Sequence, residues 1–339
     1  MSGGEGVKLL AEAVSACQNA LQVYTREKFP QEWAKAQNNL GSALLSHSRR
    51  MPGAEGVRLE VEAVTAFHNA LQVYNREQLP QDWAMIQNNL GFALRFRGER
   101  MGGEEGMKLL AEAVSSYYNA LQVYTREQFP QEWVRTQSNL GDVYCLLSEW
   151  RKAAQCYANV LRLHPNYRKA YQRLSDICHE RLFAYEVAFK LHQVWLTGFP
   201  DDLSAMPNFA EAHFTTGRFA ECRERIGALI AKPEIEAGTK IALRMIEIAN
   251  LVALDNANQA PAVLAALHKT ISDQKADFRI NWSFSGAIHF IIKQENFVSY
   301  RAWLNQFFSI AQEENRDAIV EALRKAQAQF PAVNNNQRK

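Results

Sequence analysis

The chain has 339 residues, 47% of them hydrophobic and 22% charged, which is typical of a soluble folded protein. Its 38 basic and 36 acidic side chains leave a formal net charge of +2, so the chain as a whole lacks the strong field expected of a nucleic-acid-binding or membrane-surface protein. No apolar run approaches the 18 residues of a transmembrane helix, and the first residues lack the apolar run of a signal peptide. The five cysteines are scattered and odd in number, which favours free thiols in a reducing compartment, and we expect a cytoplasmic protein.

Three copies of a 50-residue unit make up residues 1–150. The first and second copies match at 30 of 50 positions, and the first and third match at 31. A fixed period of this length is typical of a stacked solenoid, in which each unit buries its apolar face against its neighbours. Such a fold offers an extended surface, so the repeat favours binding over catalysis.

Each unit predicts two helices. The first-type helix is expected over about 31–48, with Pro30 near its start, where a missing N–H costs little. A glycine-rich turn separates it from a second-type helix over 57–77, whose apolar residues recur every three or four positions. Strand signals are absent, because no segment alternates with period two.

From Leu140 the period shortens. Leu140 and Gly141 are followed by Tyr144, Ala153, Tyr157 and Pro165. These offsets match the tetratricopeptide pattern, in which Gly and Ala allow close helix packing, aromatic rings fill the gaps and Pro ends the second helix. The same frame recurs over 171–200 and becomes degenerate afterwards. A last helix is expected over 315–330.

The phrases Trp-Ala-x-x-Gln-Asn-Asn-Leu-Gly and Thr-Arg-Glu-x-Phe-Pro-x-Glu-Trp give the chain its resemblance to known proteins. The unit is similar to the long tetratricopeptide repeats of kinesin light chains and of the spindle-orientation adaptor family. It most resembles bacterial arrays that are often joined to caspase-like proteases of the CHAT type. The resemblance is strong over 1–200 and weak over 200–330, and no protease module is visible in this sequence.

The resemblance implies an all-α fold, a right-handed tetratricopeptide superhelix, or α-solenoid, of about seven helix-turn-helix repeats. We expect three long repeats over 1–150 and standard 34-residue-type repeats over 151–200. Degenerate repeats with a capping helix are expected over 201–330, followed by a polar tail over 331–339.

Asparagines before the Leu-Gly step are the best candidates for function. In the resembled families, asparagine at the position before Leu-Gly lies on the concave face and can hydrogen-bond a bound peptide backbone, because an amide donates and accepts at once. The alternative is that these residues bond neighbouring helices and hold the superhelix. Residues one helical turn away share the same face. The predicted partner-binding groove comprises Lys35, Asn38, Asn39, Ser42, Met85, Asn88, Asn89, Phe92, Arg135, Asn139, Asp142, Lys169, Arg173 and Asp176.

Catalytic signals are poor. Cys178 and His179 are adjacent on a predicted helix, whereas a catalytic dyad brings its two groups from separate elements. No phosphate-binding glycine loop and no zinc-ligand spacing occurs. We therefore expect no enzyme activity, no catalytic residues, no cofactor and no metal. A helical enzyme using His179, His289 or a cysteine would need these groups to converge in one cleft.

The sequence thus predicts a non-catalytic scaffold or adaptor that captures a protein segment in its concave groove. The alternative, from the resemblance, is a regulatory or sensing module of a larger caspase-like (CHAT) protease or defence assembly. We expect a protein or peptide partner, no membrane and no nucleic acid, and leave self-association open. Arginines near the ends of the first-type helices, Arg49, Arg50, Arg95, Arg97 and Arg100, are interpreted as structural, because cations are favoured at helix C-termini.

Overall fold

The computed structural model describes residues 3–331, and within that range it contains α-helices, short 3-10 and π turns, and no strands. The chain divides into two compact units, residues 1–170 and 171–339. The predicted all-α solenoid is confirmed, and the polar tail expected over 331–339 lies, apart from Pro331, outside the described residues.

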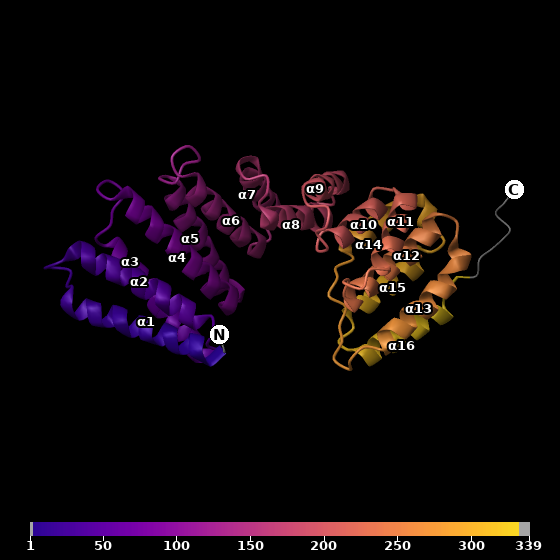
Figure 1. Cartoon of the computed structure of the whole chain (residues 1–339), viewed down its shortest axis with the longest axis horizontal. Coiled ribbons are helices and arrows are strands. Elements are labelled where there is room, and N and C mark those ends of the chain that lie inside the picture. Colours follow the sequence, from indigo (N-terminus) through magenta and orange to yellow (C-terminus); the bar gives the residue numbers. More distant parts are fainter. Residues whose placement is uncertain (1–2, 332–339) are drawn as a thin grey trace. The chain divides into compact units, whose positions relative to one another are not determined.

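Unit 1 is built from antiparallel helix pairs. Its helices are α1 (Gly3–Val23), α2 (Pro30–Ser48), α3 (Gly53–Leu71), α4 (Pro80–Met101), α5 (Gly103–Leu121), α6 (Pro130–Leu146) and α7 (Trp150–Leu163). The first-type helices α2, α4 and α6 pair with the second-type helices α3, α5 and α7, and Figure 1 shows successive helices side by side. The fold of this unit therefore follows the sequence repeat.

Each Leu-Gly glycine faces an aromatic ring of the paired second-type helix. A Cβ added at Gly41 would lie 2.9 Å from the ring of Phe67, and one at Gly91 would lie 3.0 Å from Tyr117. In the shortened repeat the same contact joins Gly141 to Tyr157, again at 2.9 Å. The glycine thus sets how closely the two helices of a pair approach, as the repeat pattern predicted.

The second-type helices end earlier than predicted. Helix α3 stops at Leu71 instead of Glu77, because the Oδ1 of Asn75 accepts hydrogen bonds from the backbone N–H groups of Glu77 and Gln78 at 3.1 and 2.9 Å. Such a side-chain turn competes with helical hydrogen bonding. In the following repeat the hydroxyl of Thr125 forms a similar turn, accepting from the N–H of Gln128 at 3.2 Å.

Helix α1 has the sequence of a second-type helix but is covered on one side only. Leu9 is 49% exposed, whereas its equivalent Leu59 is 4% exposed. Tyr24 is 38% exposed, whereas Tyr74 is 7% exposed. Helix α3 packs against the preceding helix α2, and α5 packs against the preceding helix α4. The equivalent face of α1 has no such helix against it within the described residues.

Unit 2 continues with shorter and less regular helices. After α8 (Arg168–Asp176), which spans the boundary, come the π turn η1 (Ile177–Arg181), α9 (Tyr185–Gly198), α10 (Met206–Thr215), α11 (Phe219–Ile230), α12 (Ala237–Ala253) and α13 (Ala260–Ser272). Then follow α14 (Ser285–Lys293), α15 (Arg301–Ser309) and α16 (Arg316–Ala328), with 3-10 turns η2 (Ala257–Gln259), η3 (Glu295–Phe297) and η4 (Ile310–Gln312) between them. A cluster of aliphatic and aromatic side chains contributed by α10 to α16 forms much of its core, and a smaller one contains Phe189, Phe209 and Ala212.

The last helix agrees with its prediction over 315–330. Helix α16 begins at Arg316, and the side chain of Asn315 caps it by accepting a hydrogen bond from the N–H of Ala318 at 3.0 Å. An asparagine at this position satisfies one of the free N–H groups at the helix start. Buried Ile319 and Leu323 fix this helix on the core of unit 2.

Candidate functional site

The two residues of each asparagine pair have different environments. Asn38 and Asn88 are 7% and 4% exposed and point between the first-type helices. The Nδ2 of Asn89 donates to the Oδ1 of Asn38 at 3.0 Å, and the hydroxyl of Thr136 hydrogen-bonds the Oδ1 of Asn88 at 3.1 Å. These bonds join α2 to α4 and α4 to α6, so several members of the predicted set hold the repeats together.

The other members of the asparagine set face outward. Asn39 is exposed and Asn139 is half-buried, and neither side chain forms a hydrogen bond within residues 3–331. Lys35 and Arg135 are also exposed on the same helices, with no ion pair in the described range of the chain. Ser42 is exposed as well, although its hydroxyl donates to the backbone carbonyl of Asn38 at 3.0 Å.

Asp142 and Lys169 are brought together by the fold. Asp142 is 8% exposed, and its Oδ1 accepts from the hydroxyl of Tyr157 at 2.6 Å. Its Oδ2 accepts from the Nζ of Lys169 at 2.7 Å and lies 3.6 Å from the Nη1 of Arg95. This carboxylate is therefore already occupied by side chains of unit 1.

Aromatic rings and arginines form a cluster at the end of α4. The rings of Phe92 and Phe96 meet edge to face, with centroids 4.9 Å apart. The guanidinium of Arg95 lies 5.2 Å from the first ring and 4.7 Å from the second, and Arg49 lies 4.8 Å from Phe96. Cations over aromatic faces are attracted by the ring quadrupole. Arg49 and Arg95, which the sequence assigned to helix ends, thus border the predicted surface.

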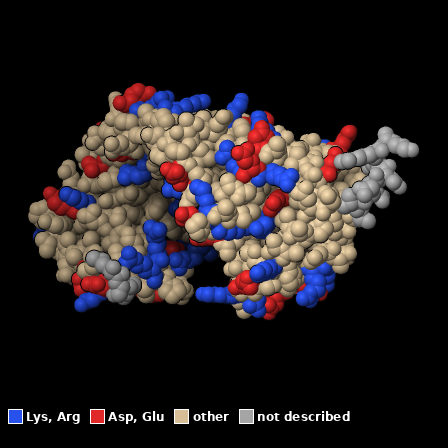
Figure 2. Space-filling model, turned by 45° about the vertical axis from the view of Figure 1, so that its right-hand side comes forward, with Lys and Arg blue, Asp and Glu red and all other residues tan. Residues whose placement is uncertain are grey.

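The remaining residues of the predicted groove are divided between the two units. Met85 is half-buried against a small core cluster around Ala84 and Tyr124. Arg173 and Asp176 are exposed on the segment of α8 that belongs to unit 2. Figure 2 shows basic and acidic side chains interspersed over the face in view, without a continuous field of either sign.

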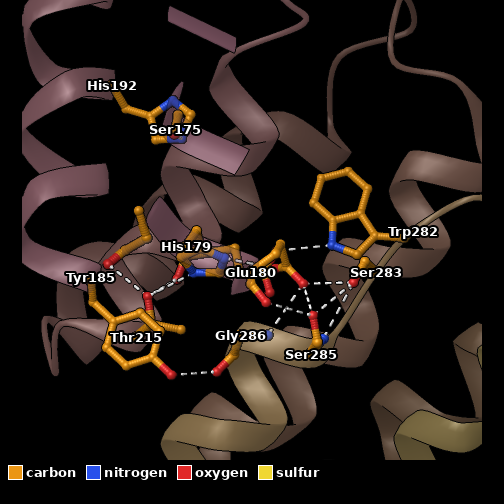
Figure 3. A network of polar contacts seen from close by, with 12 residues as sticks. Ser175, His179, Glu180, Tyr185, His192, Thr215, Trp282, Ser283, Ser285 and Gly286 are labelled. Carbon is orange, nitrogen blue, oxygen red and sulfur yellow. Dashed lines mark hydrogen bonds and ion pairs between the residues drawn. The ribbon is translucent and has the colours of Figure 1, made fainter. Parts of the chain in front are cut away.

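A second candidate site, which the sequence analysis missed, is a buried polar network in unit 2 (Figure 3). His179 and Glu180 lie on the π turn η1, and Glu211 lies on α10. One nitrogen or oxygen atom from each of these three residues lies within 4.8 Å of the other two. A π turn inside a helical array is uncommon and frequently marks a functional position.

Hydrogen bonds orient the side chains of this network. The Nδ1 of His179 lies 2.8 Å from the Oε1 of Glu180, and its Nε2 lies 2.9 Å from the hydroxyl of Thr215. The Oε2 of Glu180 accepts from the hydroxyls of Ser283, at 2.6 Å, and Ser285. Residues from η1, α10 and the start of α14 therefore meet at one point.

The N-terminus of α14 completes the environment of Glu180. The backbone N–H of Gly286 donates to the Oε2 of Glu180 at 3.3 Å, which favours a negative charge at a helix start. A Cβ at Gly286 would lie 2.6 Å from the Nδ1 of His179, so only glycine allows this approach. The hydroxyl of Tyr185 donates to the carbonyl of Gly286 at 3.0 Å and fixes the helix start.

Burial and mutual charge shift the protonation of these groups. Burial disfavours a charged imidazole at His179, but the hydrogen bond to Glu180 and the neighbouring carboxylates outweigh it and raise its pKa. Burial acts to raise the pKa of Glu180, yet the hydrogen bonds and charge of His179 lower it. Glu211, which is 3% exposed, has its pKa raised by burial to about 7.

A cleft of about 830 Å³ lies beside this network, and Tyr185 and Thr215 contribute to its wall. The ring of Tyr185 is 5.5 Å from the imidazole of His179 and 6.4 Å from that of His289, which stacks on Phe183. The two histidines considered for a helical enzyme are thus near one another. His179, however, is 7% exposed, and burial raises the pKa of the Cys178 thiol to about 11, so this thiol is not an activated nucleophile.

No protein-family model matches the chain, and no curated protein matches it at a significant level. Among solved structures, the fold is similar to a tetratricopeptide repeat protein from Parabacteroides merdae, with 16% identity, a TM-score of 0.46, and coverage of 77% of this chain and 86% of that chain. It is also similar to BtubC (BKLC) from P. vanneervenii, with 12% identity, a TM-score of 0.34, and coverage of 84% and 97%. The assignment of helical repeats therefore rests on the packing within this chain. No described helix is long and apolar enough to cross a membrane.

Proposed function

We propose that unit 1 is a non-catalytic protein-interaction scaffold that binds an extended protein segment along α2, α4 and α6. The observation that carries this proposal is that two asparagines before the Leu-Gly step, Asn39 and Asn139, keep their side-chain amides unbonded within residues 3–331, whereas the third, Asn89, donates to Asn38. Asn38 and Asn88 bond neighbouring helices, while Asn39 and Asn139 present amides that have no partner within the described residues. The outward amides are therefore held at a spacing fixed by the repeat.

The chemistry of the surface indicates the kind of segment that would bind. Lys35 and Arg135 supply unpaired positive charges, and Phe92 and Phe96 supply half-buried aromatic surface. An extended segment with acidic and apolar side chains would match both, and its backbone would hydrogen-bond Asn39. A rigid surface lowers the ordering cost of binding, because only the flexible partner must be immobilised.

Peptide display against the full chain tests this proposal. Selected peptides are expected to be enriched in acidic and apolar residues. Replacing Arg135 by Glu should weaken them at least tenfold, whereas Arg151→Glu on the exposed face of α7 should not. Each of Asn39→Ala and Asn139→Ala should cost about 0.5–1.5 kcal/mol, a factor of roughly 2 to 13.

The charge-matched control separates a specific surface from general attraction. If Arg151→Glu weakens the peptides as much as Arg135→Glu, the binding is non-specific and the proposed surface is wrong. Circular dichroism of each variant must match the parent, since a loss of helix would assign Asn39 and Asn139 to the fold instead.

The cellular setting belongs to the proposal as well. The five cysteines are odd in number and scattered along the sequence, which supports a reducing compartment such as the cytoplasm. The alternative of a regulatory module in a caspase-like protease assembly stays a prediction from the sequence resemblance.

A further inference from the structure

The buried network of unit 2 contains a carboxylate oxygen with no protein partner. The Oε2 of Glu211 accepts from the indole N–H of Trp282 at 2.9 Å, but its Oε1 has neither a hydrogen-bond partner nor accessible surface among the described residues. An unpartnered buried polar atom is costly and calls for a specific explanation. The explanation must account for why a second carboxylate, Glu180, lies beside it.

The hydrogen bonds of Thr215 determine the tautomer of His179, that is, which ring nitrogen carries the proton and which has a free lone pair. The Thr215 hydroxyl is within 3.3 Å of the carbonyl of Glu211 and 3.4 Å of that of Ala212, so its proton is directed to the backbone. Its oxygen then accepts from the Nε2–H of His179 at 2.9 Å. In the neutral imidazole, Nδ1 is left as a lone pair that faces the Oε1 of Glu180 at 2.8 Å.

A lone pair facing a carboxylate oxygen at this distance requires positive charge between or beside them. A proton on Nδ1 would satisfy His179 and Glu180. It would leave no positive charge to balance the carboxylate of Glu211 when that carboxylate is ionised. A divalent cation would compensate both carboxylates and leave His179 neutral. Buried charges are tolerated when they are paired or coordinate a metal.

The surroundings of the three residues have the features of a metal site. Ligating histidines usually donate their other N–H to a protein oxygen, as His179 does to Thr215, and ligating carboxylates are hydrogen-bonded in turn, as Glu180 is by Ser283. The absence of a side chain at Gly286 keeps a methyl group from pressing on Nδ1 and Oε1, because a Cβ there would lie 2.6 and 3.0 Å from them. Thr215 also lines the neighbouring cleft, so the three residues lie close to open space.

We propose that His179, Glu180 and Glu211 bind a divalent first-row transition-metal ion in unit 2. One imidazole nitrogen and two carboxylate oxygens suit Mn²⁺ or Zn²⁺. The ion joins η1 to α10, and through the hydrogen bonds of Glu180 it also holds the start of α14. The site is independent of the peptide-binding surface proposed for unit 1.

Manganese is the better probe, because thiolates elsewhere in the chain bind it poorly. The full chain, stripped with a chelator, is titrated with MnCl₂, and free ion is counted by electron paramagnetic resonance. One equivalent is expected to bind. Replacing Glu211 by Gln, which keeps the shape and the acceptor for Trp282, should weaken binding at least tenfold. Glu224→Gln, on the exposed face of α11, should bind as the parent does.

A measurement on the unchanged chain covers the case in which Glu211→Gln fails to fold. Hydrogen exchange is followed with and without one equivalent of MnCl₂, and peptides covering 177–181 and 206–215 should become more protected. The proposal is overturned if the folded parent binds no Mn²⁺, if Glu211→Gln binds as tightly as the parent, or if binding leaves exchange in both peptides unchanged.

Discussion

Replacing Gly91 by alanine is expected to destabilise unit 1, although alanine is the better helix former. The new methyl group would lie 3.0 Å from two ring carbons of Tyr117 and 3.1 Å from a third, against an ordinary contact of 3.4–4 Å. Tyr117 is fully buried, so its ring has no free space into which to move. The close helix approach at the Leu-Gly step thus depends on the absent side chain.

Two opposing effects set the size of the change. Alanine in place of glycine stabilises a helix interior by up to about 1 kcal/mol. Overpacking a filled core costs about 1–3 kcal/mol. Because the three atoms nearest to the new methyl group all belong to the buried ring of Tyr117, we expect overpacking to win, with a net loss of about 1 kcal/mol for Gly91→Ala. Gly227 in α11, whose Cβ would meet no atom within 4 Å, should instead gain stability as Gly227→Ala.

Hydrogen exchange measured by mass spectrometry suits this test, because the chain has two units and a single melting curve need not report on one of them. Peptides from α4 and α5 should lose protection in Gly91→Ala and regain some of it when Tyr117 is also replaced by Leu. A favourable coupling of about 0.5 kcal/mol or more is expected between the two sites. If Gly91→Ala is as stabilising as Gly227→Ala, or if the coupling is absent, the contact does not limit helix approach and the reasoning is refuted.

Three further predictions concern the rest of the chain. With chelator present, urea denaturation should show stability falling as pH rises from about 4.5 to 7, because the pKa of Glu211 is raised by burial from 4.5 to about 7. The contribution of Glu211 is at most about 3 kcal/mol, and the fall should be smaller in Glu211→Gln, where Asp176 and His179, whose pKa values are also raised, still titrate. Asn88→Ala should cost about 1–3 kcal/mol in thermal melts, because it removes a buried partner between α4 and α6, and a change below 0.5 kcal/mol would count against that bond. A copy of Leu79–Arg100, the sequence of a first-type helix, placed before Met1 should cover the open face of α1 and bury Tyr24. Hydrogen exchange in α1 should then become slower, and unchanged exchange would show that this face is not a packing surface.

The sequence repeat determined the fold of unit 1 because its information is local. Leu-Gly steps such as Leu90-Gly91, the prolines and the three-and-four spacing specify where each helix begins and which neighbour along the chain it packs against. Solenoid contacts join elements that are adjacent in sequence, so the period is enough to predict the pairing. The ends of α3 and α5 were placed too late, because the turns at Asn75 and Thr125 override the apolar pattern.

Only the tertiary structure decided what the polar residues do. Asn38 and Asn39 are neighbours with the same side chain, yet one is buried between helices and the other is exposed, because a helix turns each residue by about 100° relative to the one before it. The network of Glu180 depends on Ser285, 105 residues away, and on Thr215 of a third element. No periodic signal in the sequence links these positions. Glu180, Thr215 and Ser285 come together because the helices of unit 2 pack around a shared aliphatic and aromatic core.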